Sequence, residues 1–346
     1  MRLDPAKATA FVFGLAPWRR HLRNWLPHHR IYRFSRRLGY LAFHAFCAPL
    51  ILLHRNAEVV VWGYKHPEFL PAFCERHGIP LIRIEDGFLR SVALGRQGAP
   101  PLSLCLDRTG LYFDPTRPSD LERIIEAHDF ASDRPLMQRA EHCLQLLLDS
   151  RLSKYNAAPE VDIDRLYGIK TGKRILVLGQ VEGDMSLVKG LEAKIDNNDL
   201  VRIAVSENPG AQVIYKPHPE VLHRTRNEPP QSHPDEVRDI CLVLDQDVAL
   251  ADALDTIDHV YTMTSLSGFE ALIRGIRVTC LGAPFYAGWG ATDDRQACPR
   301  RTARRTPLEI FAAAYILYPR YFEPVTGEAI ELERALECLA RMRRGG

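Results

Sequence analysis

Residues 264–282 combine hydroxyl groups, a glycine and a carboxylate in a pattern suited to binding a phosphorylated ligand. The segment follows an apolar run and predicts a strand, a tight turn, a helix and a second strand. A helix start offers free backbone N–H groups, so a phosphate would contact the residues of this turn, which are Thr264, Ser265, Ser267 and Gly268. Glu270, in the first helical turn, would bind sugar hydroxyls of the same ligand. The alternative is a connection without a ligand, in which Ser265 and Gly275 cap the helix.

Residues 212–219 predict a short strand that ends in Lys216 and His218, each followed by a proline. Ligands of α/β proteins bind at strand ends. Lys216 would supply a point charge, and His218 a directional donor, to a nucleotide phosphate and its leaving oxygen. The alternative is a surface turn with an incidental histidine, because the His-Pro pair also occurs at His66.

Residues 81–95 place two adjacent carboxylates, Glu85 and Asp86, between an apolar strand and a glycine turn. Adjacent side chains of an extended chain point in opposite directions, so one carboxylate can face a cleft while the other caps the turn. Arg83 and Arg90 flank the pair and would hold a substrate carboxylate. A solvated turn with a local ion pair is the alternative.

Residues 174–186 form an apolar strand that runs into a glycine-rich loop carrying Gln180, Glu182, Asp184 and Ser186. We select Asp184 for chemistry because small neighbouring residues would let a ligand approach it closely. The alternative is that Asp184 or Ser186 caps a helix.

These segments resemble the bacterial capsule polysaccharide synthesis proteins of the KpsC/LipA type, which transfer β-linked Kdo. The resemblance runs in the same order from about residue 57 to about residue 325. It rests on Glu85-Asp-Gly-Phe-Leu-Arg-Ser91, Ser153-Lys-Tyr-Asn156, Gly179-Gln-Val-Glu-Gly-Asp-Met-Ser186, Lys216-Pro-His-Pro219, Thr264-Ser-Leu-Ser-Gly-Phe-Glu-Ala-Leu272 and Pro284-Phe-Tyr-Ala-Gly-Trp-Gly290. The first and last strings are unusual and rarely arise together by chance.

The resemblance implies a GT-B-like fold: two Rossmann-like α/β domains with parallel sheets, and C-terminal helices that pack back on them. It also implies a CMP-Kdo donor, no metal or other cofactor, and retention of the β configuration. Members often carry two such modules, whereas this chain holds one, so it would be a single-activity enzyme or part of a split system. Members commonly have Asp at the position of Gly179, which leaves Asp184 as the best match.

We therefore expect a glycosyltransferase with the nucleotide in the second domain and the acceptor against the first. Asp184 is the candidate nucleophile, Glu85 the candidate base, and Asp86 a further catalytic candidate. The expected substrate contacts are Arg90, Gln180, Ser186, Tyr286 and Trp289, although a packed loop explains the last two nearly as well. A polyol-phosphate transferase of the teichoic-acid kind and a non-catalytic partner in capsule assembly or export remain alternatives.

Composition agrees with this interpretation. A length of 346 residues predicts two domains, and 46% apolar with 25% charged residues is typical of a soluble globular protein. The net charge of +2 does not indicate a nucleic-acid partner. The eight cysteines include no Cys-x-x-Cys pair or zinc spacing, which predicts reduced residues in a cytoplasmic protein.

The N-terminal segment, residues 1–56, is expected to be a basic amphipathic part of the first domain. Its charge is uneven, because no acidic residue occurs from Ala6 to Ala57. Its arginines predict contact with an anionic membrane surface, so peripheral attachment to the inner membrane is left open. They are Arg19, Arg20, Arg23, Arg30, Arg33, Arg36 and Arg37, interspersed with Trp18, Trp25, Tyr32 and Phe34. The apolar residues 38–53 are too few for a spanning helix, and we expect no signal peptide. A basic solvated helix face is the alternative.

Alternating strands and helices predict two α/β domains, at residues 57–155 and 173–305, joined by a linker at residues 156–172. Strands are expected near residues 59–62, 81–85 and 104–107 in the first domain. In the second they are expected near residues 175–178, 213–216, 242–244, 259–261 and 278–281. Ser119 and Glu122 have the spacing of a capping box, and residues 306–346 read as helical.

Overall fold

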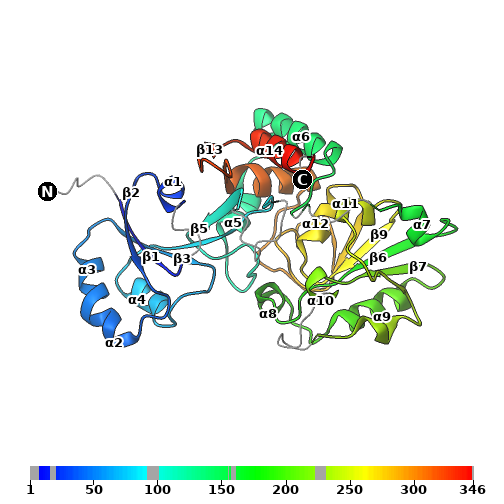
Figure 1. Cartoon of the computed structure of the whole chain (residues 1–346), viewed down its shortest axis with the longest axis horizontal. Helices are drawn as coiled ribbons and strands as arrows, with labels where there is room; N and C mark the ends of the chain where they lie inside the picture. Colours follow the sequence, from blue (N-terminus) through cyan, green and yellow to red (C-terminus); the bar gives the residue numbers. More distant parts are fainter. Residues whose placement is uncertain are drawn as a thin grey trace.

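The computed structural model describes residues 8–15, 21–91, 101–154, 156, 161–222 and 231–344. Within these residues two β-sheets form the centres of two α/β domains, and a group of helices lies where the domains meet (Figure 1). This arrangement confirms the expected fold class. The sequence interpretation also used Trp18, Arg19, Arg20 and Tyr155, which fall outside the described residues.

Seven strands form the first sheet, in the order β13-β12-β5-β4-β3-β1-β2. They are β1 (Ala8–Phe13), β2 (His29–Phe34), β3 (Ala57–Trp62), β4 (Leu81–Asp86), β5 (Ser103–Asp107), β12 (Pro319–Phe322) and β13 (Ala329–Ile330). Strands β4, β3, β1 and β2 are parallel, so their carboxyl ends meet at one edge. Strand β5 pairs antiparallel with β4 and β12, which corrects the expectation of a parallel sheet. A parallel return normally needs a helical crossover, and the described residues between β4 and β5 form no helix.

Six strands form the second sheet, which is parallel throughout, in the order β11-β10-β9-β6-β7-β8. They are β6 (Arg174–Leu178), β7 (Gln212–Lys216), β8 (Leu242–Val243), β9 (His259–Thr262), β10 (Arg277–Cys280) and β11 (Asp293–Asp294). Every residue of β6 and β9 is buried, as expected for central strands of a sheet covered on both faces. Because β6 and β9 are parallel neighbours, the loops that follow them meet at the carboxyl edge.

Helices pack around these sheets and at the junction between them (Figure 1). Around the first sheet lie α1 (Leu22–Trp25), α2 (Tyr40–Ala42), the π-helix η1 (Phe43–Cys47), α3 (Ala48–Leu52) and α4 (Leu70–Arg76). Around the second lie α7 (Ile163–Tyr167), α8 (Met185–Gly190), α9 (Asn197–Glu207), α10 (Pro219–Leu222), the 3-10 helix η3 (Pro234–Val237), α11 (Leu250–Ala253) and α12 (Leu266–Leu272). The junction holds α5 (Asp120–Ala127), α6 (Arg134–Asp149), α13 (Pro307–Phe311), the π-helix η4 (Ala312–Leu317) and α14 (Leu332–Arg344). No helix in the described part of the chain is long and apolar enough to cross a membrane.

The C-terminal region ties the two domains together. Helices α13 and α14 contact α6, while β12 and β13 join the first sheet, so the expectation that this region is entirely helical is corrected. The largest hydrophobic cluster includes Phe88 of the first domain, Phe269 of the second and Tyr315 of η4. Ser119 caps α5 as predicted, but the Glu122 carboxylate pairs with Arg300 and Arg301 instead of completing a capping box.

The N-terminal segment belongs to the first domain. Strand β1 lies between β3 and β2, and β2 forms the edge of the sheet with Arg30 and Arg33 on it. Charged side chains on an edge strand discourage pairing with another sheet. These arginines therefore lie on a strand, not on the helix face that we considered.

Candidate active site

Gln180 joins the loop after β6 to the loop after β9. Its side chain accepts a hydrogen bond from the Thr264 backbone N–H at 2.8 Å and donates one to Thr264 Oγ1 at 3.0 Å. Thr264 Oγ1 in turn donates to Ser186 Oγ at 3.2 Å. The structure thus brings together two segments that the sequence interpretation assigns to ligand binding, at the edge of the parallel sheet where ligands of such sheets bind.

Asn197 is a residue of this site that the sequence interpretation missed. It is fully buried at the start of α9, where its Oδ1 accepts the Gln180 backbone N–H at 2.8 Å. Its Nδ2 donates to the Gln180 carbonyl oxygen and to the Glu182 carboxylate, both at 2.9 Å. Asn197 therefore fixes the backbone of the loop that leads to Asp184. The sequence around Asn197 gave little indication of this role, because an asparagine beside the N-cap Asp196 is typical of an ordinary helix start.

Ser265 begins α12 as its N-cap, with Oγ accepting the Ser267 backbone N–H at 3.2 Å. The Ser265 carbonyl oxygen accepts the Tyr286 hydroxyl at 2.5 Å. Gly268 lies against the same ring, since a Cβ atom there would come within 2.2 Å of the Tyr286 hydroxyl oxygen. The capping alternative for Ser265 is thus observed, and Gly268 has a packing role. Phosphate binding by this turn stays a prediction.

Tyr286 and Trp289 are expected from the sequence to stack on a sugar or a base, whereas both rings are fully buried. Trp289 Nε1 donates to the Phe285 carbonyl oxygen at 2.8 Å, and Phe285 and Phe269 pack near Tyr286. A fully buried ring offers no face to a ligand. The structure corrects this expectation and favours the alternative, a packed loop that supports the α12 turn.

Glu270 lies in α12, but its carboxylate contacts Lys154, in the segment that connects α6 to α7. Glu270 Oε1 accepts the Lys154 backbone N–H at 2.9 Å, and the Lys154 carbonyl oxygen accepts the Arg90 N–H at 3.3 Å. Asn156 exchanges two hydrogen bonds of 2.8 Å with the Ser153 backbone. Burial raises the pKa of Glu270 to about 7, opposed by the charges of Arg274 and Lys154. Glu270 thus anchors the connecting segment, and its contact with a sugar stays a prediction.

Lys216 is the last residue of β7, and His218 lies two residues beyond it. Burial lowers the pKa of the Lys216 ammonium group, and the negative charge of Asp247 opposes this shift. His218 Nδ1 accepts the Glu220 backbone N–H at 3.1 Å, which places the proton of a neutral ring on Nε2. The pair therefore offers a partly desolvated cation and an oriented ring, both suited to a phosphate.

Asp184 is exposed and begins α8 as its N-cap, with Oδ1 accepting the Ser186 backbone N–H at 2.8 Å. The capping alternative is therefore observed. Capping engages only Oδ1, and Oδ2 has no hydrogen-bond partner among the described residues. The carboxylate is thus held in one orientation with one oxygen toward solvent, and its role as a nucleophile stays a prediction.

Glu85 ends β4 in a different environment. The side chain is half-buried, its Oε1 accepts the Asp86 backbone N–H at 3.1 Å, and its Oε2 lies where a Cβ atom on Gly63 would come within 2.8 Å. Burial, reinforced by the negative charge of Asp86, raises the pKa of Glu85 to about 7, although Lys154 and Lys65 oppose the shift. A carboxyl group with this pKa can accept and release a proton at neutral pH, as a general base must.

Asp86 and Arg90 bind each other. Arg90 Nε donates to Asp86 Oδ2 at 2.6 Å, and Arg90 Nη1 donates to Ser91 Oγ at 3.0 Å. Arg90 is only 2% exposed, so the local ion pair proposed as the alternative exists, but it is buried rather than solvated. Arg90 is therefore not placed to hold a substrate carboxylate. Of the two adjacent carboxylates, Glu85 is the one without a cationic hydrogen-bond partner in the described part of the chain.

Helix α8 reaches the first domain at its C-terminal end. The Lys189 ammonium group lies 5.6 Å from the centroid of the Tyr64 ring, and the Tyr64 hydroxyl donates to Asp114. A Cβ atom on Gly190 would lie 3.0 Å from Thr264 and 3.8 Å from the Phe113 carbonyl oxygen. The helix that starts at Asp184 therefore ends beside Tyr64. The residue before Tyr64 is Gly63, which lies against the Glu85 carboxylate.

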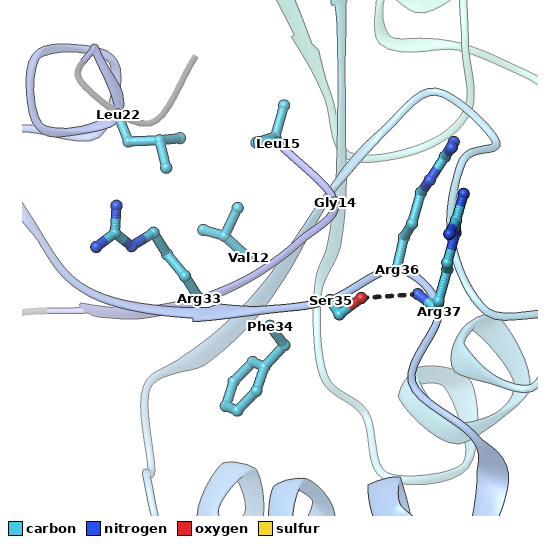
Figure 2. Close-up of a pocket in the computed structure, with 9 residues that line it drawn as sticks. All are labelled: Val12, Gly14, Leu15, Leu22, Arg33, Phe34, Ser35, Arg36 and Arg37. Carbon is cyan, nitrogen blue, oxygen red and sulfur yellow. Dashed lines mark hydrogen bonds between the residues drawn. The ribbon is translucent and has the colours of Figure 1, made fainter. Parts of the chain in front are cut away.

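A cavity of about 560 Å³ opens at the carboxyl ends of β1 and β2, beside three arginines (Figure 2). The lining residues are Val12, Gly14, Leu15, Leu22, Arg33, Phe34, Ser35, Arg36 and Arg37. In Figure 2 Arg33 extends on the side of Leu22, and Arg36 and Arg37 extend together from the turn after β2. No described residue pairs with the three guanidinium groups. Uncompensated positive charge in a cavity attracts an anionic ligand.

Comparison with known proteins identifies the family. Residues 57–157 and 130–321 match the family described as capsule polysaccharide biosynthesis protein. The lipopolysaccharide-processing protein LpsZ of Rhizobium meliloti is 45% identical over 341 residues, which cover 98% of this chain and 76% of LpsZ. The capsule polysaccharide modification protein LipA of Neisseria meningitidis serogroup B is 38% identical over 303 residues, which cover 84% of this chain and 42% of LipA. The chain belongs to the capsule polysaccharide biosynthesis protein family, as the resemblance predicts.

Two solved structures share the fold along nearly the whole chain. A Thermosulfurimonas dismutans KpsC structure, described as a β-Kdo 2,4 transferase, matches with a TM-score of 0.82 and 36% identity, covering 96% of this chain and 98% of that one. A second, described as a β-Kdo 2,7 transferase, matches with a TM-score of 0.74 and 30% identity, covering 97% and 99%. The match therefore covers nearly the whole of these two structures but less than half of LipA.

Proposed function

We propose that the chain is a retaining glycosyltransferase that moves β-linked Kdo from CMP-Kdo to a saccharide or glycolipid acceptor of capsule or related surface polysaccharide synthesis. The observation that carries the proposal is the likeness, at 36% identity and over 96% of the chain, to a structure described as a β-Kdo 2,4 transferase. The side chains required for such a transfer occur at strand ends and loops of both domains.

The nucleotide would bind the second domain at the carboxyl edge of its parallel sheet. Lys216 and His218 Nε2 would neutralise the phosphate of CMP as it leaves, which lowers the barrier by stabilising developing charge. Gln180, Thr264 and Ser186 form one hydrogen-bonded unit whose polar groups would orient the donor. With the leaving charge met by these side chains, the transfer would need no metal or further cofactor.

Retention would follow from two successive displacements. In the first, Asp184 Oδ2 attacks the anomeric carbon of Kdo, and the bond to the phosphate breaks with its electron pair leaving on CMP. In the second, the acceptor hydroxyl oxygen attacks the same carbon, the bond to Asp184 breaks, and the hydroxyl proton passes to Glu85. The raised pKa of Glu85 suits this step, because the group then binds a proton firmly enough to draw it from the hydroxyl.

The acceptor would lie against the first domain, where Glu85 ends β4. The arginine-lined cavity at the ends of β1 and β2 adjoins this region, because a Cβ atom on Gly14 would lie 3.3 Å from the Lys65 carbonyl oxygen. The Arg33 guanidinium group in this cavity suits an acidic sugar or a phosphate on the acceptor. The transfer would take place in the cytoplasm, and a partner transferase would supply a second module.

Incubation of the purified chain with CMP-Kdo and, separately, with other activated donors tests the proposal. Mass analysis of products on saccharide and lipid acceptors should detect addition of Kdo, with CMP released in equal amount. Nuclear magnetic resonance of the product should show a β linkage. Transfer of a polyol phosphate without transfer of Kdo would replace the proposal by the teichoic-acid alternative, and no transfer from any donor would favour a non-catalytic assembly partner.

A further inference from the structure

The segment from Tyr40 to Leu53, comprising α2, η1 and α3, is apolar on two opposite sides. On its inner side Phe43, Cys47 and Ile51 are buried against the sheet residues Phe11 and Val59. On its outer side the exposed residues are also apolar, namely Tyr40, Leu41, Ala45, Phe46, Pro49, Leu52 and Leu53. A surface helix normally carries polar residues on its outer face, and a helix apolar all round is normally buried in protein or lipid. This outer face, which we call the apolar face, therefore lacks the usual polar cover.

The exposure of these side chains is large. Leu41 is 82% exposed, Phe46 76% and Leu53 79%, and they recur along one helical segment. Isolated exposed apolar residues are common on proteins, but a contiguous group on one element indicates an interaction surface. In Figure 1 the segment lies on the outer side of the first domain, at the end of the molecule away from the second domain. The apolar face is thus separate from the candidate active site.

Positively charged residues precede and follow the segment that carries the apolar face. Arg36 and Arg37 precede the segment, Arg55 follows it, and all three are exposed. No carboxylate occurs between residues 6 and 57, so nothing in this part of the sequence offsets these charges. We propose that the apolar face docks on the surface of an anionic lipid bilayer, with Leu41, Phe46 and Leu53 inserted among the acyl chains and the bracketing arginines at the level of the phosphates.

Charge decides between a bilayer and a second copy of the chain. Two copies that met symmetrically through this face would bring arginines of one copy beside arginines of the other, and like charges oppose such contact. An anionic bilayer instead pairs the arginines with phosphates and covers the leucine and phenylalanine side chains at the same time. This docking does not depend on the identity of the sugar donor.

Flotation of the full chain with lipid vesicles tests the proposal. The chain should bind vesicles of phosphatidylcholine and phosphatidylglycerol more tightly than vesicles of phosphatidylcholine alone, and added salt should weaken the difference because it screens the arginines. The variant Leu41→Ser/Phe46→Ser/Leu53→Ser should lower the partition into anionic vesicles at least about tenfold, because burial of apolar area supplies much of such binding. Its transfer activity on a short water-soluble acceptor should equal that of the unaltered chain.

A matched control replaces Ile169 and Val325, which are 89% and 86% exposed on other parts of the molecule. The variant Ile169→Ser/Val325→Ser should bind vesicles like the unaltered chain. The proposal is overturned if the triple variant binds as well as the unaltered chain, or if the unaltered chain ignores anionic vesicles at low salt. It is also overturned if sedimentation velocity shows a dimer that the triple substitution dissociates while vesicles are not bound, because a second copy then covers the face.

Discussion

Glu85 and Asp184 are the two carboxylates proposed to do the chemistry, and they differ in nearly every physical respect. Glu85 is half-buried in the first domain, has Asp86 as a negatively charged neighbour, and its pKa is raised to about 7. Asp184 is exposed in the second domain and is held by the start of α8. The chain thus presents one carboxyl group that resists ionisation and one that is held in direction by a hydrogen bond at the start of a helix.

This difference assigns different roles. A base must hold a proton near neutral pH, which desolvation of Glu85 favours, whereas a nucleophile must be fixed in direction, which the hydrogen bond from the Ser186 backbone N–H to Oδ1 provides for Asp184. Pairs of carboxyl groups in contrasting environments divide acid–base and nucleophilic roles in this way in other enzymes. The comparison also shows that a helix cap and a nucleophile are compatible, because the cap uses only one of the two oxygens.

Replacement of Asp184 should have the largest effect. Asp184→Asn preserves shape and capping, because asparagine caps about as well as aspartate, but it removes the nucleophile. Transfer from CMP-Kdo should fall on the order of a thousandfold or more, while CMP affinity measured by calorimetry stays unchanged. If Asp184 merely caps α8, the asparagine variant will keep most of its activity and Asp184→Ala will lose stability instead.

Replacement of Glu85 should have the next largest effect and should change the pH dependence. The base works only when ionised, so a pKa of about 7 predicts that the transfer rate of the unaltered chain rises as pH increases through 7. Glu85→Gln should lower the rate by about a hundredfold or more and abolish this rise. A rate that is flat between pH 6 and pH 8 in the unaltered chain would contradict the assignment. Glu75→Gln, an exposed change on α4, is the control.

Glu270 tests whether burial alone distinguishes a catalytic carboxyl group, because its pKa is also raised to about 7 while its described role is structural. Because the pKa of Glu270 is raised in the folded chain, its protonated form contributes stability. This contribution is fully present below the unfolded pKa of about 4.5 and is lost as pH rises through 7. The glutamine of Glu270→Gln does not ionise, so this pH-dependent loss of stability does not occur in the variant. The free energy of unfolding of the variant, compared with that of the unaltered chain, should therefore increase by up to roughly 3 kcal/mol between pH 4 and pH 8.

Urea unfolding at the two pH values measures this difference for Glu270→Gln. A stability difference that does not change with pH would show that the carboxyl group is not desolvated as described. The same variant should be assayed for CMP affinity, since a contact of Glu270 with the ribose would weaken binding without altering the pH dependence of stability.

Replacement of His218 should have the smallest of these effects. His218→Ala removes one hydrogen bond to the donor phosphate, which costs about 1.5–3 kcal/mol when one partner is charged. CMP binding and turnover should therefore fall together by roughly ten- to a hundredfold, with the fold intact by circular dichroism. Calorimetry that finds unchanged CMP affinity would remove His218 from the site. His66→Ala, at another His-Pro pair, is the matched control.

The sequence predicted the elements whose signals are local. Apolar runs that end in polar loops located β3 to β10, because continuous burial in a sheet requires such runs. It did not locate β1 and β2, which lie in the segment that we interpreted by its charge alone, or the two-residue strand β11. It also missed β12 and β13, because these short strands acquire their pairing only when the C-terminal region returns to the first sheet. For the same reason it could not show that β5 runs antiparallel.

The candidate site also has features that the sequence predicted and features that it could not predict. The motifs assigned Thr264 to the nucleotide and Gln180 and Ser186 to the substrate, and the structure joins these three residues by hydrogen bonds. Burial is a property of tertiary packing, so the sequence could not show that Tyr286 and Trp289 are enclosed or that Glu85 is desolvated. The sequence also could not predict the apolar face of residues 40–53, because an apolar run does not show which of its sides is exposed in the folded protein.

Intact-protein mass spectrometry after mixing the chain with CMP-Kdo, without acceptor, tests the central claim most directly. We predict a covalent adduct of one Kdo residue that peptide mapping places on Asp184, that is absent from Asp184→Asn and that disappears when acceptor is added. An adduct on another residue, or efficient transfer by Asp184→Asn with no adduct, would contradict the account and move the nucleophilic role away from Asp184.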